Sequence, residues 1–359
     1  MTSHTYLYLF YQVSFLLTIQ MKRLRSLLGY QAALLRILCL TAFCLCTKTG
    51  CAAGFQFIEV PADNDGPALR GAVWTPCEVA AEKLSVGPIV IRGVKNCAVS
   101  LSQLPLIVIS HGYAGSLFDQ RDTAEILADA GFVVASINHS DDNYQIRGGP
   151  NDKIVALATR TIDIKRLIDY MLRKWEWHQS LAPEKVGFYG FSRGGYTGLV
   201  LAGAKPDFSR LPLSSFSSCV SGSEGPACKQ ARQRLQELLD SPITHDERIQ
   251  AAVIADPLSV VFDAEALKEV AIPVQLWSSA YGGDGVTPAS VAAVRRNLRV
   301  APDWHLVENA THFGFVLPCS AALRESHPDI CGDQPGFNRE AFHRDFNNRI
   351  LAFFKKHLN

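Results

Sequence analysis

The feature of this sequence that most constrains its fold is a Gly-x-Ser-x-Gly box, Gly-Phe-Ser-Arg-Gly, at residues 190–194. The box directly follows the apolar run at residues 186–189 and precedes the helix-compatible stretch at residues 195–204. This order predicts a strand, a sharp turn and a helix, with Ser192 on the turn in a strained backbone conformation. The glycines fit because side chains there would collide with strand and helix. A chain of this length matches the box by chance roughly one time in ten, so other residues must supply the partners of a nucleophilic serine.

Strand-like and helix-like segments alternate along the chain on both sides of the box. Two leading strands, expected to pair antiparallel, are predicted at residues 55–60 and 70–75. Later strands are predicted at residues 104–110, 132–137, 185–190, 251–255, 273–278 and 304–308. Helices are predicted at residues 119–130, 164–172, 195–204, 264–270, 288–298 and 340–357. The alternation predicts the α/β class, with a mostly parallel central sheet and helices on both faces.

One segment does not fit the alternation. Residues 207–248 are rich in Ser and Pro and contain a helix-like run at residues 231–239. We expect a small insertion after the helix that follows the box. The insertion is either a cap over the site or a surface excursion, and the sequence leaves both alternatives open.

The first 53 residues are predicted to be a signal or targeting segment. A basic cluster follows Met21, an apolar run occupies residues 37–46, and Cys51-Ala52-Ala53 resembles a small-residue cleavage site. The apolar run is too short for a spanning helix, which needs about 20 residues. A second apolar stretch lies upstream, at residues 6–19. The preferred interpretation is that translation starts at Met21, and the alternative is a retained N-terminal membrane anchor.

Residues 54–359 are expected to form a single domain in the periplasm or outside the cell. The preceding segment holds five of the chain's 35 basic residues and none of its 34 acidic ones, so the domain carries a net charge of −4. The domain has no basic stripe, which makes nucleic acid an unexpected partner. It also has no run of 18 or more apolar residues, so no membrane span is predicted there.

Six cysteines remain in the predicted domain. They are Cys77, Cys97, Cys219, Cys228, Cys319 and Cys331. Six cysteines allow 15 connectivities, and the simplest is local pairing of each residue with its neighbour in this order. The alternative of six free thiols is less favoured in an exported protein. The spacings, without clustered histidines, argue against a zinc site.

A nucleophilic serine needs a base and an orienting carboxylate, which follow it along the chain as acid and then histidine in hydrolases with this elbow. His312 closely follows the last predicted strand, so it should lie at the carboxyl edge of the sheet, where the box also opens. His305 lies inside that strand, and His343 and His357 lie on the terminal helix. His312 is therefore the predicted base.

Two carboxylates compete for the third place. Asp284 lies in a glycine-rich loop after the penultimate strand, and Asp256 follows the strand before that. Both loops should lie at the catalytic edge. Asp284 is the preferred acid and Asp256 the alternative. An Asp beside glycines is also a common turn former, and an Asp before Pro is also a common helix cap.

The oxyanion hole is predicted to combine the backbone N–H groups of Arg193 and Tyr113. These are the residue after the nucleophile and a residue in the loop after the strand at 104–110. His111 precedes that loop and is expected to brace it. His139 and the pair Asp141-Asp142 are weak evidence for a metal and are interpreted as part of a solvated loop.

With these residues the chain resembles the α/β-hydrolase superfamily. More narrowly, it is similar to secreted bacterial proteins labelled predicted dienelactone hydrolases, which are related to platelet-activating-factor acetylhydrolases. Residues 109–113 match the family's Ser-His-Gly oxyanion loop, and residues 190–195 match its elbow. Residues 311–313, followed by Leu-Pro-Cys at residues 317–319, match its histidine segment.

The resemblance implies hydrolysis of a carboxylic ester, of a lipid or of a short acyl group, with no metal or organic cofactor. True dienelactone hydrolases use cysteine where this chain has Ser192, so their name does not identify the substrate. In the acetylhydrolase relatives the acid follows the earlier strand, as Asp256 does. In related cutinase-like esterases it occupies the position that matches Asp284.

We therefore expect a serine hydrolase that acts on small-molecule or lipid esters through an acyl-enzyme. A peptidase or amidase is the first alternative, because the same three residues can cleave amides. A non-catalytic binding protein on the same fold is the second, because fold does not fix function.

Overall fold

The computed structural model of this chain describes residues 52–80, 82–86, 89–146, 156–211, 219, 224–240 and 245–359. All of them belong to one compact unit, Gly50–Asn359. The expected targeting segment lies outside the described residues except for Ala52 and Ala53. Those two residues belong to the first strand and pair with Cys77 and Pro76, so the sheet begins earlier than residue 55.

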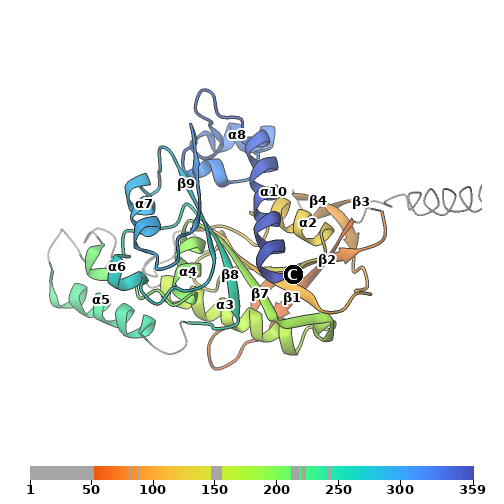
Figure 1. Cartoon of the computed structure of the whole chain (residues 1–359), viewed down its shortest axis with the longest axis horizontal. Helices are drawn as coiled ribbons and strands as arrows, with labels where there is room; N and C mark the ends of the chain where they lie inside the picture. Colours follow the sequence, from red (N-terminus) through yellow and green to blue (C-terminus); the bar gives the residue numbers. More distant parts are fainter. Residues whose placement is uncertain are drawn as a thin grey trace, which may run out of the picture. The chain divides into compact units, whose positions relative to one another are not determined.

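Ten strands form one sheet across the described residues, in the order β10-β9-β8-β7-β5-β6-β2-β1-β4-β3 (Figure 1). The strands are β1 (Ala52–Val60), β2 (Leu69–Cys77), β3 (Glu82–Val86), β4 (Ile89–Lys95), β5 (Leu104–Ser110), β6 (Val133–Ile137), β7 (Leu181–Phe191), β8 (Ile249–Ala255), β9 (Val274–Ser279) and β10 (Asp303–Val307). In the part of the sheet that contains β10, β9, β8, β7, β5 and β6, in that order, neighbouring strands all pair parallel. The predicted α/β class with a mostly parallel sheet is confirmed, as is the antiparallel pairing of β1 with β2.

Two strands were not predicted from the sequence. β3 and β4 pair antiparallel and extend the sheet beyond β1. Most of their side chains are exposed or half-buried. A strand at the edge of a sheet lacks the continuous apolar run of a strand buried on both faces, so this pair resembled a punctuated loop in the sequence.

Helices cover both faces of the parallel strands. α3 (Ala156–Arg173) and α4 (Arg193–Leu201) bury their apolar residues in one core cluster, and α2 (Arg121–Asp129) and α10 (Arg339–Leu358) bury theirs in a second. Figure 1 shows α10, in dark blue, lying across the strands. The other helices among the described residues are α5 (Pro226–Leu239), α6 (Ala264–Leu267), α7 (Pro288–Asn297), α8 (Ala321–Ser326) and α9 (Pro328–Cys331). The 3₁₀ turns are η1 (His178–Ser180), η2 (Phe208–Arg210) and η5 (His312–Phe315).

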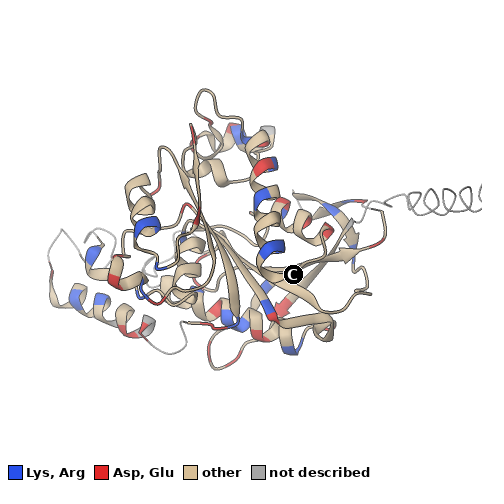
Figure 2. Ribbon diagram, viewed as in Figure 1, with Lys and Arg blue, Asp and Glu red and all other residues tan. Residues whose placement is uncertain are grey.

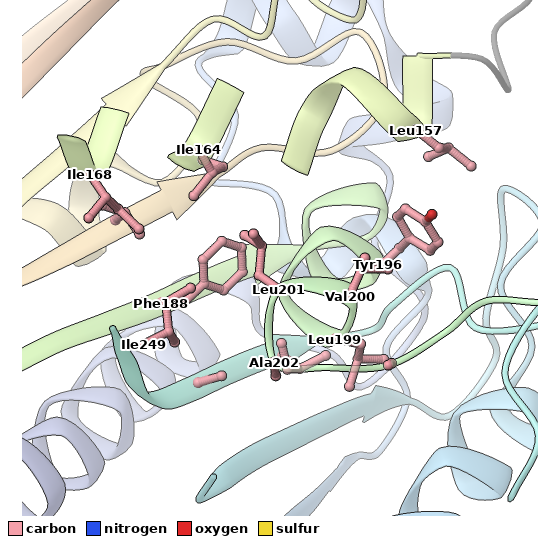
Figure 3. Packing of buried hydrophobic residues seen from close by; sticks show 14 of the residues in the cluster. Leu157, Ile164, Ile168, Phe188, Tyr196, Leu199, Val200, Leu201, Ala202 and Ile249 are labelled. Carbon is pink, nitrogen blue, oxygen red and sulfur yellow. The ribbon is translucent and has the colours of Figure 1, made fainter. Parts of the chain in front are cut away.

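The packing of α3 on α4 fixes the helix that follows the box. Ile164 and Ile168 of α3 belong to the same buried cluster as Leu199 and Leu201 of α4 and Phe188 of β7, all of which Figure 3 labels. All five side chains are buried. Burial of a side chain of this size contributes about 1.5–3 kcal/mol, so α4 is held firmly between β7 and α3.

Charged residues lie mainly on the helices and loops and not on the central strands, as Figure 2 shows for α5 and α10. A few charged side chains are nevertheless buried, among them Arg160, Asp142 and Asp163. Burying a charge is unfavourable unless it is paired and hydrogen-bonded. Arg160 pairs with Asp142 at 2.8 Å, and Asp163 lies 3.2 Å from His139 and 3.8 Å from Arg166.

The six cysteines of the domain form three disulfides, Cys77–Cys97, Cys219–Cys228 and Cys319–Cys331. This is the local pairing expected from their spacing. The last bridge joins the segment after η5 to α9 and so tethers the chain a few residues beyond His312.

The predicted insertion at residues 207–248 is described only in part. Its helix, α5, begins at Pro226, five residues earlier than expected, and packs on η2 and α3. Arg232 donates hydrogen bonds to the carbonyl oxygens of Phe208, Ser209 and Leu211. Residues 212–218, 220–223 and 241–244 of the predicted insertion lie outside the described residues.

Candidate active site

Ser192 lies on the turn between β7 and α4 with φ 56° and ψ −116°. A left-handed φ is uncommon for a residue other than glycine and marks a strained turn. The flanking glycines make the turn possible. A Cβ on Gly190 would lie 2.2 Å from the carbonyl oxygen of Gly194, and one on Gly194 would lie 1.9 Å from that of Ser110. The strand, turn and helix that the box predicts are all present.

The close approach at Gly194 makes a testable prediction. We expect Gly194→Ala to lower the free energy of unfolding by about 3 kcal/mol or more, because the added methyl group meets a backbone carbonyl that cannot rotate away. Gly225→Ala is the matched control, since a Cβ there has no atom within 4 Å and φ is −63°. Urea unfolding of both variants measures the difference. Equal stability of the two variants would contradict the geometry of the turn.

His312 begins η5, in the loop after β10, and is buried. Its Nε2 lies 3.0 Å from Ser192 Oγ, and its Nδ1 lies 2.7 Å from Asp256 Oδ2. The imidazole ring stacks on the ring of Phe191, with centroids 4.7 Å apart. A neutral imidazole with its proton on Nδ1 donates to Asp256 and accepts the hydroxyl proton of Ser192.

Asp256 follows β8 and is completely buried. Its Oδ1 accepts the backbone N–H of Ser279 at 2.9 Å, and its Oδ2 accepts the Ser279 hydroxyl at 2.8 Å in addition to His312. Hydrogen bonds of this kind stabilise a buried carboxylate and fix its orientation. Asp256 is therefore held in one position against Nδ1 of the histidine.

The loop of Asp284, the acid preferred from the sequence, does lie at the catalytic edge, where the His312 N–H donates to the Gly282 carbonyl oxygen at 2.8 Å, but the Asp284 carboxylate does not contact the imidazole. Asp284 is exposed at the tip of a tight hairpin, where Gly283 and Val286 exchange backbone hydrogen bonds of 2.9 Å. Asp284 and Gly285 have φ values of 47° and 80°, as in a type I′ turn, which favours Asp-Gly. Within the described residues no hydrogen bond or ion pair joins Asp284 to His312. Asp284 has the geometry of a turn former, and the alternative, Asp256, faces the imidazole.

The loop after β5 runs beside the serine. A Cβ on Gly112 would lie 3.5 Å from Ser192 Cβ, which brings the backbone next to Tyr113 close to the hydroxyl-bearing residue. Arg193 is the first residue of α4, and its guanidinium carbon lies 4.2 Å from the centroid of the Tyr113 ring. The structure thus brings together both residues that the sequence predicts as oxyanion donors.

A buried polar network lies beneath this loop, and sequence reasoning missed its centre. Arg160 of α3 is completely buried and donates to Asp142, Ser110, Thr197 and the His111 carbonyl oxygen. Its position four residues before Ile164, on the apolar stripe of α3, is the one sequence signal that could have revealed it. His139 is completely buried and Asp142 is 3% exposed, so the interpretation of these two residues as part of a solvated loop is wrong.

The two histidines of the network, His111 and His139, are uncharged and hold neighbouring groups in place. His139 contacts Ser110 Oγ at 2.9 Å and Asp163 Oδ2 at 3.2 Å, and its backbone N–H lies 3.3 Å from His111 Nε2. Burial, reinforced by the charge of Arg160, holds the pKa of both imidazoles well below its usual range. Neither histidine contacts Ser192 in the described hydrogen bonds, in keeping with the bracing role expected of His111.

No group of three or more His, Cys, Asp or Glu side chains is arranged to hold a metal ion in the part of the chain that the structure describes. Within the same residues, no helix combines the length and the apolar character that crossing a membrane requires.

Comparison with known proteins identifies the fold. A ferulic acid esterase from Streptomyces cinnamoneus is similar with a TM-score of 0.59 and 16% identity, over 87% of this chain and 91% of that one. A dienelactone hydrolase from Anabaena variabilis aligns with a TM-score of 0.48 and 16% identity, over 86% of this chain and 99% of that one. No protein-family model and no curated protein matches the chain. The first likeness establishes the α/β-hydrolase fold and nothing finer, and the second supports no conclusion about this chain.

Proposed function

We propose that this chain, which has the α/β-hydrolase fold, is a serine hydrolase that cleaves carboxylic esters through an acyl-enzyme. One observation carries the proposal. Ser192, on its strained turn, is linked through His312 to the buried Asp256 by hydrogen bonds of 3.0 and 2.7 Å. A nucleophile, a base and an orienting carboxylate in this order are the parts that acyl transfer requires.

The proposed reaction follows from the roles of these groups. Ser192 Oγ attacks the ester carbonyl while its proton passes to His312 Nε2, and Asp256 stabilises the imidazolium that forms. The backbone N–H groups of Tyr113 and Arg193 hold the negative oxygen of the tetrahedral intermediate. His312 then gives its proton to the leaving alcohol. Water, activated by the same imidazole, releases the acid and restores the serine.

The substrate is proposed to be a small-molecule or lipid ester. A panel of p-nitrophenyl esters of increasing acyl length, with a feruloyl ester and a peptide anilide beside them, tests the proposal. We expect turnover of at least one ester with a kcat/KM well above that for the anilide. Faster cleavage of the anilide would favour the peptidase alternative. Folded protein that turns over no ester would contradict the proposed function.

We also propose that the protein acts in the periplasm or outside the cell. Three disulfides in a domain of this size are typical of an oxidising compartment. We expect mass spectrometry of the exported protein to find an N-terminus near Gly54 and no alkylated cysteine among the six of the domain. Free thiols in exported protein would contradict this prediction. A retained N-terminal segment would instead favour the anchored alternative.

A further inference from the structure

Asp142 is a buried carboxylate that contacts both segments of the proposed oxyanion hole. Its Oδ1 accepts the backbone N–H of Ala114, the residue after Tyr113, at 2.8 Å. Its Oδ2 accepts from the Arg193 guanidinium at 3.1 Å. One side chain therefore links the loop after β5 to the first residue of α4.

The Asp142 carboxylate is itself held in place by Arg160 of α3. Its Oδ2 also accepts from Arg160 at 2.8 Å, and Arg160 in turn donates to Ser110 Oγ, at the end of β5, at 3.1 Å. Burial opposes ionisation of the carboxyl, but Arg160, Arg193 and the Ala114 N–H outweigh burial and lower the pKa of Asp142. The group is therefore charged at neutral pH, with both of its oxygens engaged.

These contacts constrain the chain next to each of the two proposed backbone donors. Ala114 has φ 50°, a strained value that an N–H bound to a fixed carboxylate helps to maintain. On the other side, the Arg193 guanidinium is held between Asp142 and the ring of Tyr113. Donors in an oxyanion hole must lie within a few tenths of an ångström of their working positions, because their effect depends on preorganised geometry.

We infer that Asp142 is a positioning residue for the oxyanion hole, holding the loop at residues 111–115 and the start of α4 so that the N–H groups of Tyr113 and Arg193 converge. The inference rests on the proposed function of Ser192. Asp142 does not contact the reacting atoms, and it acts through Ala114 and Arg193.

The test compares Asp142→Asn with Asp141→Asn, a neighbouring carboxylate that is only half-buried. The amide introduced by Asp142→Asn can still accept the Ala114 N–H, but the substitution removes the negative charge that holds Arg193 and Arg160. We expect Asp142→Asn to lower kcat/KM for the best ester by roughly 10²-fold, the scale on which a misplaced catalytic group acts. Asp141→Asn should remain within about 2-fold of wild type, inside the spread of ordinary surface substitutions.

A second readout separates positioning from a merely structural role. A trifluoromethyl ketone adds to the serine and places a negative oxygen in the oxyanion hole, whereas the corresponding alcohol occupies the site without that charge. We expect Asp142→Asn to lower the affinity for the ketone by about the same factor by which it lowers kcat/KM. The affinity for the alcohol should stay nearly unchanged. Equal losses for both ligands, or no loss for the ketone, would overturn the inference.

If Asp142→Asn does not fold, Arg193→Met supplies the same measurement, because it keeps the backbone N–H and removes the guanidinium from Asp142. Arg193→Met should lower the affinity for the ketone more than the affinity for the alcohol. An unchanged ratio of the two affinities would overturn the inference. Wild-type protein without any ester turnover would refute the proposed function and the inference with it. Normal wild-type turnover with an unaffected Asp142→Asn refutes the inference alone.

Discussion

Ser192→Ala is expected to lower kcat for ester hydrolysis by about 10⁶-fold, the loss that follows removal of a catalytic serine in a comparable triad. Without Oγ no acyl-enzyme can form, and only the binding of the substrate and the oxyanion donors remain. The substitution adds no atoms and keeps a Cβ at the same strained φ, so the fold should be unchanged. Initial rates at saturating ester, together with the thermal unfolding midpoint, measure both effects.

Ser102→Ala is the matched control, because Ser102 is exposed in the loop before β5. Its activity should equal that of wild type. A Ser192→Ala variant that keeps more than about a hundredth of the wild-type kcat would show that another group attacks the ester. Trace wild-type contamination is excluded by repeating the assay after treatment with a serine-directed inhibitor.

Asp256→Asn is expected to lower kcat by about 10⁴-fold, as the loss of the orienting carboxylate does in a serine protease. The amide carries no charge to stabilise the imidazolium, and when its oxygen keeps the Ser279 N–H its NH2 group faces Nδ1 of His312 in place of an acceptor. Since Ser279 donates to both oxygens of Asp256, some loss of stability should accompany the loss of rate. KM should change little, because Asp256 is completely buried and does not face the substrate.

Asp284→Asn provides the control for this prediction. Asn is favoured in the type I′ turn that Asp284 occupies, and the side chain is exposed. Its kcat should stay within about 2-fold of wild type, as for an ordinary surface substitution. The reverse pattern, with Asp284→Asn the inactive variant, would mean that the hairpin rearranges to bring Asp284 against His312 in the working enzyme.

The parallel part of the sheet could be predicted from the sequence because its strands are buried on both faces. β5, for example, is fully buried and appears as an almost unbroken apolar run. β3 and β4 could not be predicted in this way. They lie at the edge of the sheet, where exposed and buried positions mix, and their pairing depends on β1, which is distant in sequence.

Local context was enough to single out Ser192 and His312, since each lies on a turn or loop directly after a predicted strand. The acid was harder to predict, because Asp256 and Asp284 both follow strands that end at the same edge of the sheet. Backbone geometry distinguishes the two. Asp256 accepts the backbone N–H of Ser279, whereas Asp284 occupies a two-residue hairpin turn. Arg160 was missed because its partners lie on other elements and a single sequence does not pair them.

Labelling with a fluorophosphonate probe tests the central claim most directly. The Ser192 hydroxyl should displace fluoride from phosphorus, with His312 accepting its proton, and leave one phosphonyl group per chain. Peptide mapping of the labelled wild-type protein should place that group on Ser192 alone, and Ser192→Ala should take up no label. A label on any other residue, or undiminished labelling of Ser192→Ala, would contradict the account.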